Sequence, residues 1–238
     1  MTARPAQPRS VRVSVPPADH VTALLYRAAA ARRTGVTVIL GHGAGADQTS
    51  SFMVEFATGL AARGFDAVTF NFVYTEHGRR VPDRNDRLEA CWRAVVAAAR
   101  SGDLVAGGSR PVIGGKSMGG RIASQIAAEP DADVAGLVLL GYPLHPPGRP
   151  DKLRAGHLGR IRAPMLFVQG SRDAFGTPDE LRTALADARA GGDLRTIEGG
   201  DHSFKVPKRG GVPQDQVYAT VLEEIAGWIA TRVAVPPR

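Results

Sequence analysis

The sequence predicts an α/β protein with a doubly wound, mainly parallel sheet and helices on both faces. Short runs of β-branched and other apolar residues recur along the chain, as in parallel strands that are buried on both sides. These runs alternate with longer segments whose apolar residues repeat at helical spacing. A chain of 238 residues is long enough for one such domain. We expect a flexible N-terminal segment at residues 1–9 and a single domain at residues 10–238.

The first expected strands differ from the later ones. Residues 10–15 alternate apolar and polar side chains, and residues 21–26 follow a Pro-rich turn, which predicts an antiparallel hairpin. Further strands are expected at residues 36–40, 66–72, 112–113, 134–140, 165–168 and 194–197. Helices are expected from about residue 50 to Gly64, over 88–99, from 118 to about 130, and over 178–189 and 217–231. Residues 74–84 read as a polar loop, and residues 152–158 leave room for one short helix.

The basic composition does not indicate nucleic-acid binding. The net charge is +7 and the pI about 10.2, but 26 of the 30 basic residues are Arg, scattered singly or in pairs. No basic stripe alternates with aromatic residues, so a solvated basic surface is the simpler interpretation. Cys91 is the only cysteine; it excludes an internal disulfide and reads as a packing residue. Without a long apolar run or a signal-like N-terminus, we expect a cytoplasmic protein with no membrane or nucleic-acid partner.

Residues 111–123 contain the pattern of a nucleophile elbow. Val112 and Ile113 form a short apolar run, and Gly115, Ser117 and Gly119 form the pattern G-x-S-x-G before helix-forming residues. In such an elbow the serine lies at a strained, usually positive-φ turn, and the glycines let strand and helix pass closely. The pattern alone is common, so its meaning depends on the rest of the chain.

An acid and a base follow two later strands. A serine hydroxyl needs a base within hydrogen-bond reach, and a carboxylate can then orient the histidine that serves as this base. Asp173 follows the strand at 165–168, and His202 follows the strand at 194–197. Active sites of doubly wound sheets form at such carboxyl ends. The order Ser117, Asp173, His202 is that of α/β-hydrolases, so we expect nucleophile, acid and base in that order.

Other interpretations of these residues remain open at this point. Asp173 would also suit a loop-capping role, Asp201 is a rival acid, and His202 would also suit a structural role. A phosphate-binding loop is the rival for Gly115, Lys116 and Ser117, but the motif requires a glycine where Arg110 stands.

The glycine-rich turn at residues 41–47 predicts an oxyanion hole. Acyl transfer develops negative charge on a carbonyl oxygen, which two preorganised N–H groups can stabilise. We expect these donors to be the backbone amides of Met118, which follows the nucleophile, and of Ala44. His42 then reads as a support for this turn rather than as a catalyst.

Several segments together resemble the α/β-hydrolase superfamily over nearly the whole chain. They lie at residues 42–46, 71–74, 78–84, 114–121, 141–148, 173–177 and 200–204. Within the superfamily, they resemble the compact testis-expressed-protein and NSL-complex-subunit type, akin to dienelactone hydrolases. The resemblance assigns the nucleophile to Ser117, the acid to Asp173 and the base to His202. Dienelactone hydrolases have a cysteine nucleophile, so Ser117 departs from their pattern.

The expected function is a serine hydrolase that cleaves a carboxylic ester or thioester of small-molecule type through an acyl-enzyme. Only residues 141–163 separate two strands where related folds insert a lid, so the cleft should be open. We expect cleft walls at His42, Tyr74, Tyr142, His145 and Phe175, although each would also suit plain packing. No metal or other cofactor is expected. The alternatives are a non-catalytic interaction module that retains the fold, and a small peptidase or amidase.

Overall fold

The structure is a computed structural model that describes residues 7–105, 110–207 and 212–233. Residues 1–6 of the expected flexible segment lie outside the described residues, as do residues 106–109, 208–211 and 234–238 of the expected domain. The sheet contains eight strands: β1 (Arg9–Val15), β2 (Asp19–Tyr26), β3 (Thr37–Gly41), β4 (Asp66–Phe70), β5 (Val112–Lys116), β6 (Gly136–Leu140), β7 (Met165–Gly170) and β8 (Asp193–Ile197).

The strand order is β1-β2-β4-β3-β5-β6-β7-β8. β1 and β2 pair antiparallel, as the alternating pattern predicted, and β2 is antiparallel to β4. All the remaining pairs are parallel. The carboxyl ends of β3, β5, β7 and β8 therefore meet along one edge of the sheet, where the expected site residues follow them.

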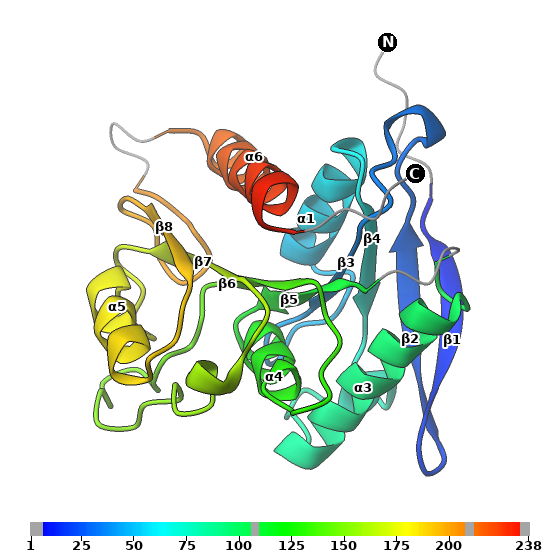
Figure 1. The fold of residues 1–238 in the computed structure, drawn as a ribbon, viewed down its shortest axis with the longest axis horizontal. Helices are drawn as coiled ribbons and strands as arrows, with labels where there is room; N and C mark the ends of the chain where they lie inside the picture. Colours follow the sequence, from blue (N-terminus) through cyan, green and yellow to red (C-terminus); the bar gives the residue numbers. More distant parts are fainter. Residues whose placement is uncertain (1–6, 106–109, 208–211, 234–238) are drawn as a thin grey trace.

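The helices cover both faces of the sheet, which confirms the doubly wound fold (Figure 1). They are α1 (Ser51–Ala62), α2 (Val73–Glu76), α3 (Asn85–Ser101), α4 (Met118–Ala127), α5 (Pro178–Asp187) and α6 (Gln214–Arg232), with short 3-10 helices η1 (Ala30–Arg32) and η2 (Leu158–Arg160). In Figure 1, α3, α4 and α5 lie on one face of the sheet, and α1 and α6 lie on the other.

Alternate residues of each central strand enter separate cores on the two faces. Ile39 of β3 packs with the side chains under α3 and α4, whereas Val38 and Leu40 pack with those under α1 and α6. The strands are apolar on both faces because both faces are covered.

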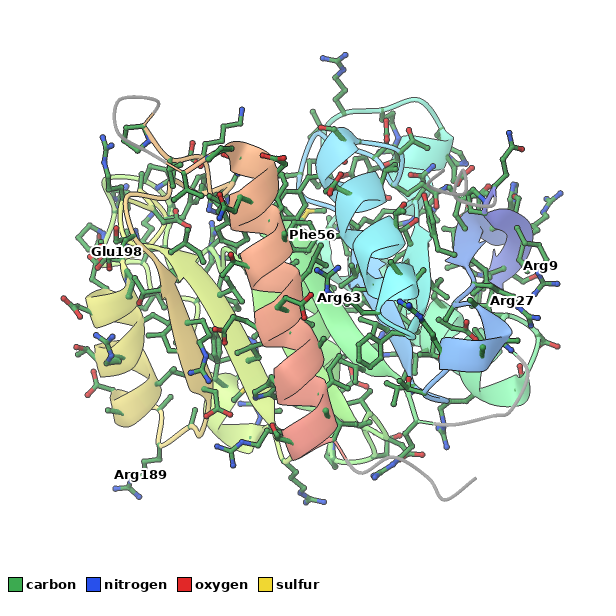
Figure 2. All side chains as sticks on the ribbon, turned by 90° about the horizontal axis from the view of Figure 1, so that it is seen from above. Arg9, Arg27, Phe56, Arg63, Arg189 and Glu198 are labelled. Carbon is green, nitrogen blue, oxygen red and sulfur yellow. The ribbon has the colours of Figure 1, made fainter. Side chains whose placement is uncertain are left out.

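On the second face, α1 and α6 lie side by side (Figure 2). Phe56 of α1 meets the Tyr218 ring of α6 edge-on, with centroids 5.4 Å apart. At the other end of α1, Arg63 Nη2 lies 2.8 Å from Glu223 Oε1. None of the helices in the described ranges is both long and apolar enough to cross a bilayer.

Three local predictions differ from the structure. The segment expected as a polar loop at 74–84 begins with helix α2, because the side chains of Val73 and Tyr74 turn fully into the core. The short helix expected at 152–158 is instead a set of turns, and η2 begins only at Leu158. α3 also begins at Asn85 rather than at 88, because its first turn is polar and exposed and so carries no apolar periodicity.

Candidate active site

Ser117 lies at a strained turn between β5 and α4. Its φ is 50° and its ψ is −117°, a combination that a residue with a side chain rarely adopts. The turn is held because the Ser117 amide donates to Leu140 O at 3.0 Å. Gly115 and Gly119 allow it, since a Cβ at either position would overlap the backbone of Gly41 in β3. The elbow is therefore pressed against the carboxyl end of the neighbouring strand.

The structure brings the three expected catalytic side chains into one hydrogen-bonded row. His202 Nε2 lies 2.8 Å from Ser117 Oγ, and His202 Nδ1 lies 2.8 Å from Asp173 Oδ2. The neutral ring can accept the serine proton at Nε2 only when its own proton is on Nδ1, and a carboxylate at Nδ1 favours that tautomer. The row has the geometry of a nucleophile, a base and an orienting acid.

The Asp173 carboxylate is fully buried and held on both oxygens. Its Oδ1 accepts the Phe175 amide at 2.8 Å, while Oδ2 accepts Gln169 Nε2 at 2.9 Å in addition to His202. The rival acid, Asp201, has a structural role instead. Its Oδ1 accepts the amides of Ser203 and Lys205 and so shapes the turn that presents His202.

Gln169 in β7 was not singled out from the sequence. Its side chain joins Asp173 to the loops on either side: Oε1 accepts the Tyr142 amide at 2.8 Å, and Nε2 also approaches Gly176 O at 2.7 Å. A fully buried amide inside an apolar strand needs such partners. That isolated polar residue in the run Met165–Gly170 was the signal that would have found it.

Lys116 is a second residue whose role the sequence did not predict. Its side chain is buried beside the row, and Nζ donates to the backbone oxygen of His202 at 2.6 Å. Nζ also lies 5.8 Å from the centroid of the Phe52 ring. Burial lowers the pKa of Lys116 to about 8, although Asp173 and Asp201 act in the opposite direction. Lys116 thus links the segment that contains His202 to β5, the strand that precedes Ser117.

The two expected oxyanion donors lie on the same cavity as Ser117. Met118 and Ala44 both line it, and neither backbone amide has a hydrogen-bond partner among the described residues. The glycine-rich turn passes close to the nucleophile, because a Cβ at Gly43 would lie 3.6 Å from Ser117 Cβ. Both amides therefore lie, without a hydrogen-bond partner among the described residues, in residues that line the cavity of Ser117.

His42 supports this turn from inside the protein. Its Nδ1 donates to Gly43 O at 2.9 Å, and its Nε2 accepts the Phe72 amide at 3.4 Å. Only a neutral ring with its proton on Nδ1 satisfies both contacts. Burial lowers the pKa of His42, which also favours the neutral form.

The cavity has a volume of about 660 Å³, and of the five expected cleft walls it contains only Phe175. The Phe175 ring lies 4.2 Å from the His202 ring. The prediction was wrong for the other four expected walls, which are buried and do not line the cavity: His42, Tyr74, Tyr142 and His145. Tyr142, for example, points its hydroxyl inward to Arg154 O at 2.7 Å. Side chains that follow buried strands here complete the core beneath the loops.

The described residues provide neither a cluster of metal ligands nor a reactive cysteine. Within the described ranges, no three His, Cys, Asp or Glu side chains cluster so as to hold a metal ion. Cys91 is buried, and burial raises the pKa of its thiol to about 11, as suits a packing residue.

Solved structures with the same arrangement include serine hydrolases. An alpha-beta serine hydrolase homologue from Coxiella burnetii is 17% identical and has a TM-score of 0.70; the match covers 98% of this chain and 100% of that one. A serine hydrolase without lid from Xanthomonas campestris is 16% identical, with a TM-score of 0.72 and coverage of 98% and 99%. A dienelactone hydrolase from Anabaena variabilis is 20% identical, with a TM-score of 0.69 and coverage of 96% and 100%. At these identities the likeness establishes a shared fold.

The family follows from the sequence match. A family model described as "Alpha/beta hydrolase domain" matches residues 34–230, which include the elbow and every strand from β3 to β8. By that match and by its fold, the chain belongs to the alpha/beta hydrolase family.

Proposed function

We propose that this protein is a serine hydrolase that cleaves a small carboxylic ester or thioester through an acyl-enzyme. Membership of the alpha/beta hydrolase family supports hydrolase chemistry. The observation that carries the proposal is the continuous row from Ser117 Oγ through the His202 ring to Asp173, with 2.8 Å at each junction. The strained backbone of Ser117 is further support, since strain of this kind gathers at functional sites.

In the first half-reaction, Ser117 Oγ attacks the carbonyl carbon of the ester as its proton passes to His202 Nε2. The negative charge on the carbonyl oxygen is stabilised by the amides of Met118 and Ala44. The tetrahedral intermediate collapses, the bond to the alcohol oxygen or thiol sulfur breaks, and the leaving group takes the proton from His202. Ser117 is left as an acyl ester.

In the second half-reaction, His202 removes a proton from water, and the resulting hydroxide attacks the acyl carbon. Collapse of this intermediate breaks the bond to Ser117 Oγ, which recovers the proton from His202. The products are a carboxylic acid and the free enzyme. The Asp173 carboxylate stabilises the imidazolium in both halves without itself taking the proton.

A fluorophosphonate probe tests the proposal directly, because it phosphonylates an activated serine. We expect labelling of the wild-type protein and none of Ser117→Ala. Ser51→Ala is the matched control: Ser51 lines the same cavity, but no hydrogen bond joins its hydroxyl to a histidine of the described chain, so labelling should equal that of the wild type. Turnover of 4-nitrophenyl esters of two to eight acyl carbons, compared with aminoacyl anilides, then separates an esterase from an amidase. Folded wild-type protein that takes up no probe and turns over no ester contradicts the proposal.

A further inference from the structure

We infer that the cleft of this hydrolase takes esters that carry a carboxylate, which Arg121 and Arg154 bind together. The inference rests on the proposed function and adds a substrate class to it. Both arginines line the cavity that contains Ser117. Arg121 lies in α4, and Arg154 lies in the segment between β6 and η2. The fold therefore brings two positive charges that are distant in the sequence to the same cavity.

The guanidinium of Arg121 is oriented but not neutralised. Its Nη1 donates to Gln125 Oε1 at 3.3 Å, and its Nη2 donates to Asn85 Oδ1 at 3.2 Å. Both acceptors are neutral amide oxygens, and Asn85 and Gln125 are themselves joined at 2.9 Å. The group is half-buried and forms no ion pair with a described residue. Its other N–H donors are left for a ligand.

Arg154 is anchored through its backbone and has a free head group. Its amide donates to Leu144 O at 2.8 Å, and its carbonyl oxygen accepts the Tyr142 hydroxyl at 2.7 Å. The guanidinium has no hydrogen-bond or ion-pair partner within the described ranges. Burial and the nearby charge of Arg154 lower the pKa of Arg121, so the two head groups repel each other. A carboxylate between them would relieve that repulsion and accept from both.

The carboxylates near the cleft do not cancel this charge. Asp83 lines the cavity, but its Oδ1 already accepts Arg79 Nη2 at 2.7 Å. Glu89 acts on Arg121 only from a distance and pairs with Arg93 at 3.0 Å.

The other cations have other surroundings. The Lys116 ammonium lies within electrostatic reach of Asp173 and Asp201, so its charge offsets those of the site's own acids. Lys205 lines the cavity as well, but its side chain is more exposed and better hydrated. Among the described residues of the cavity, the half-buried cations without an ion pair are therefore Arg121 and Arg154.

Matched esters test the inference by kinetics. For a carboxylate on the acyl side, 4-nitrophenyl hemiadipate is compared with 4-nitrophenyl hexanoate, after subtraction of uncatalysed hydrolysis. For a carboxylate on the alcohol side, 4-(hexanoyloxy)benzoate is compared with 4-acetylphenyl hexanoate. We expect kcat/KM to favour the anionic member of at least one pair by about tenfold or more, and the favoured pair identifies the side that the arginines hold.

Two variants connect that preference to the arginines. Arg121→Gln and Arg154→Gln should each lower the anionic-to-neutral ratio of kcat/KM by about 10- to 100-fold, the range for a charge-assisted hydrogen bond. Arg160→Gln is the matched control. Arg160 is exposed, lies in η2 just after the segment of Arg154 and has no ion pair with a described residue, but it does not line the cavity. Its ratio should stay within about twofold of the wild type, because solvent screens an exposed charge.

A binding measurement separates failure of this inference from failure of the proposed function. As stable analogues, adipic acid monoanilide and hexananilide for the acyl side, and 4-(hexanoylamino)benzoate and N-(4-acetylphenyl)hexanamide for the alcohol side, are titrated into Ser117→Ala by calorimetry, alone and combined with Arg121→Gln or with Arg154→Gln. Tighter binding of the anionic analogue that Arg121→Gln abolishes supports the inference even if no ester is turned over. Equal binding of the anionic and neutral analogues in both pairs, or an anionic preference that survives both arginine substitutions, overturns it even if neutral esters are hydrolysed.

Discussion

Replacement of Gln169 by Met tests whether this buried amide holds Asp173, the acid of the proposed catalytic row. Methionine is close to glutamine in length and volume, so the change removes hydrogen bonds without opening a large cavity. The Tyr142 amide and Gly176 O would each lose a side-chain partner inside the protein. Tyr142 O would still accept the Leu144 amide at 2.9 Å, so it does not count as a loss.

The expected magnitude follows from those losses. A buried polar group without a partner costs about 1–3 kcal/mol, so two groups should lower the free energy of unfolding by about 2–6 kcal/mol. Asp173 would also lose one of the hydrogen bonds that fix its carboxylate, the one from Gln169 Nε2 at 2.9 Å. Misplacement of the row should lower kcat by about 10- to 100-fold with less effect on KM.

Urea unfolding monitored by circular dichroism measures the change in the free energy of unfolding. Ester turnover under conditions in which the protein is folded measures the change in kcat and KM. Gln216→Met is the control, because Gln216 is exposed on α6 and its side chain has no hydrogen-bond partner within the described ranges. If Gln169→Met changes the free energy of unfolding by less than about 0.5 kcal/mol, as a surface change would, Gln169 only fills space and the reasoning is refuted.

Three further predictions concern the elbow and its lysine. Ser117→Gly should be more stable than Ser117→Ala by about 1 kcal/mol, because glycine adopts the positive φ of 50° without strain; equal unfolding midpoints would contradict this. Gly119→Ala should leave little folded protein on size exclusion and circular dichroism, since its Cβ would overlap Gly41 O, whereas Gly227→Ala on α6 has open space and should fold normally. The folded pKa of Lys116, about 8, lies below the ordinary 10.5, so the unfolded state binds more protons between these values. The free energy of unfolding should therefore rise with pH across that window, by roughly 3 kcal/mol from this residue, and fluorescence-monitored urea titrations of Lys116→Met should lack that component.

The fold was predictable because it depends on patterns that lie within single segments. Residues 37–40 of the β-branched run at 36–40 lie in β3, and the alternating residues 10–15 fall within β1. The expected catalytic residues were proposed on the same basis, since each lies at or shortly after the carboxyl end of a strand. Boundaries were less predictable where the decisive contacts are tertiary, as at α2, where burial of Tyr74 draws a polar-looking segment into a helix.

The walls of the cleft were poorly predicted for a related reason. Tyr142 and His145 follow a strand end just as Asp173 does, and sequence position cannot tell whether such a side chain turns outward or inward. In the structure they turn inward, whereas Arg121 and Arg154, which were given no role from the sequence, line the cavity. Gln169 and Lys116 were missed because their roles depend on partners 27 and 86 residues away.

The hydrogen bond from Lys116 to His202 has a consequence for how the enzyme fails under stress. The proposed nucleophile, Ser117, directly follows the central strand β5, which is buried throughout. The proposed base, His202, follows β8, an edge strand that is only partly covered and pairs with β7 alone among the described strands. Edge regions open locally at lower free energy than the centre of a sheet. Turnover should thus disappear in mild denaturant before the bulk of the protein unfolds. Lys116 hydrogen-bonds the segment after β8 to the central strand β5. This contact should bring the denaturant concentration at which activity is lost closer to the one at which the whole protein unfolds.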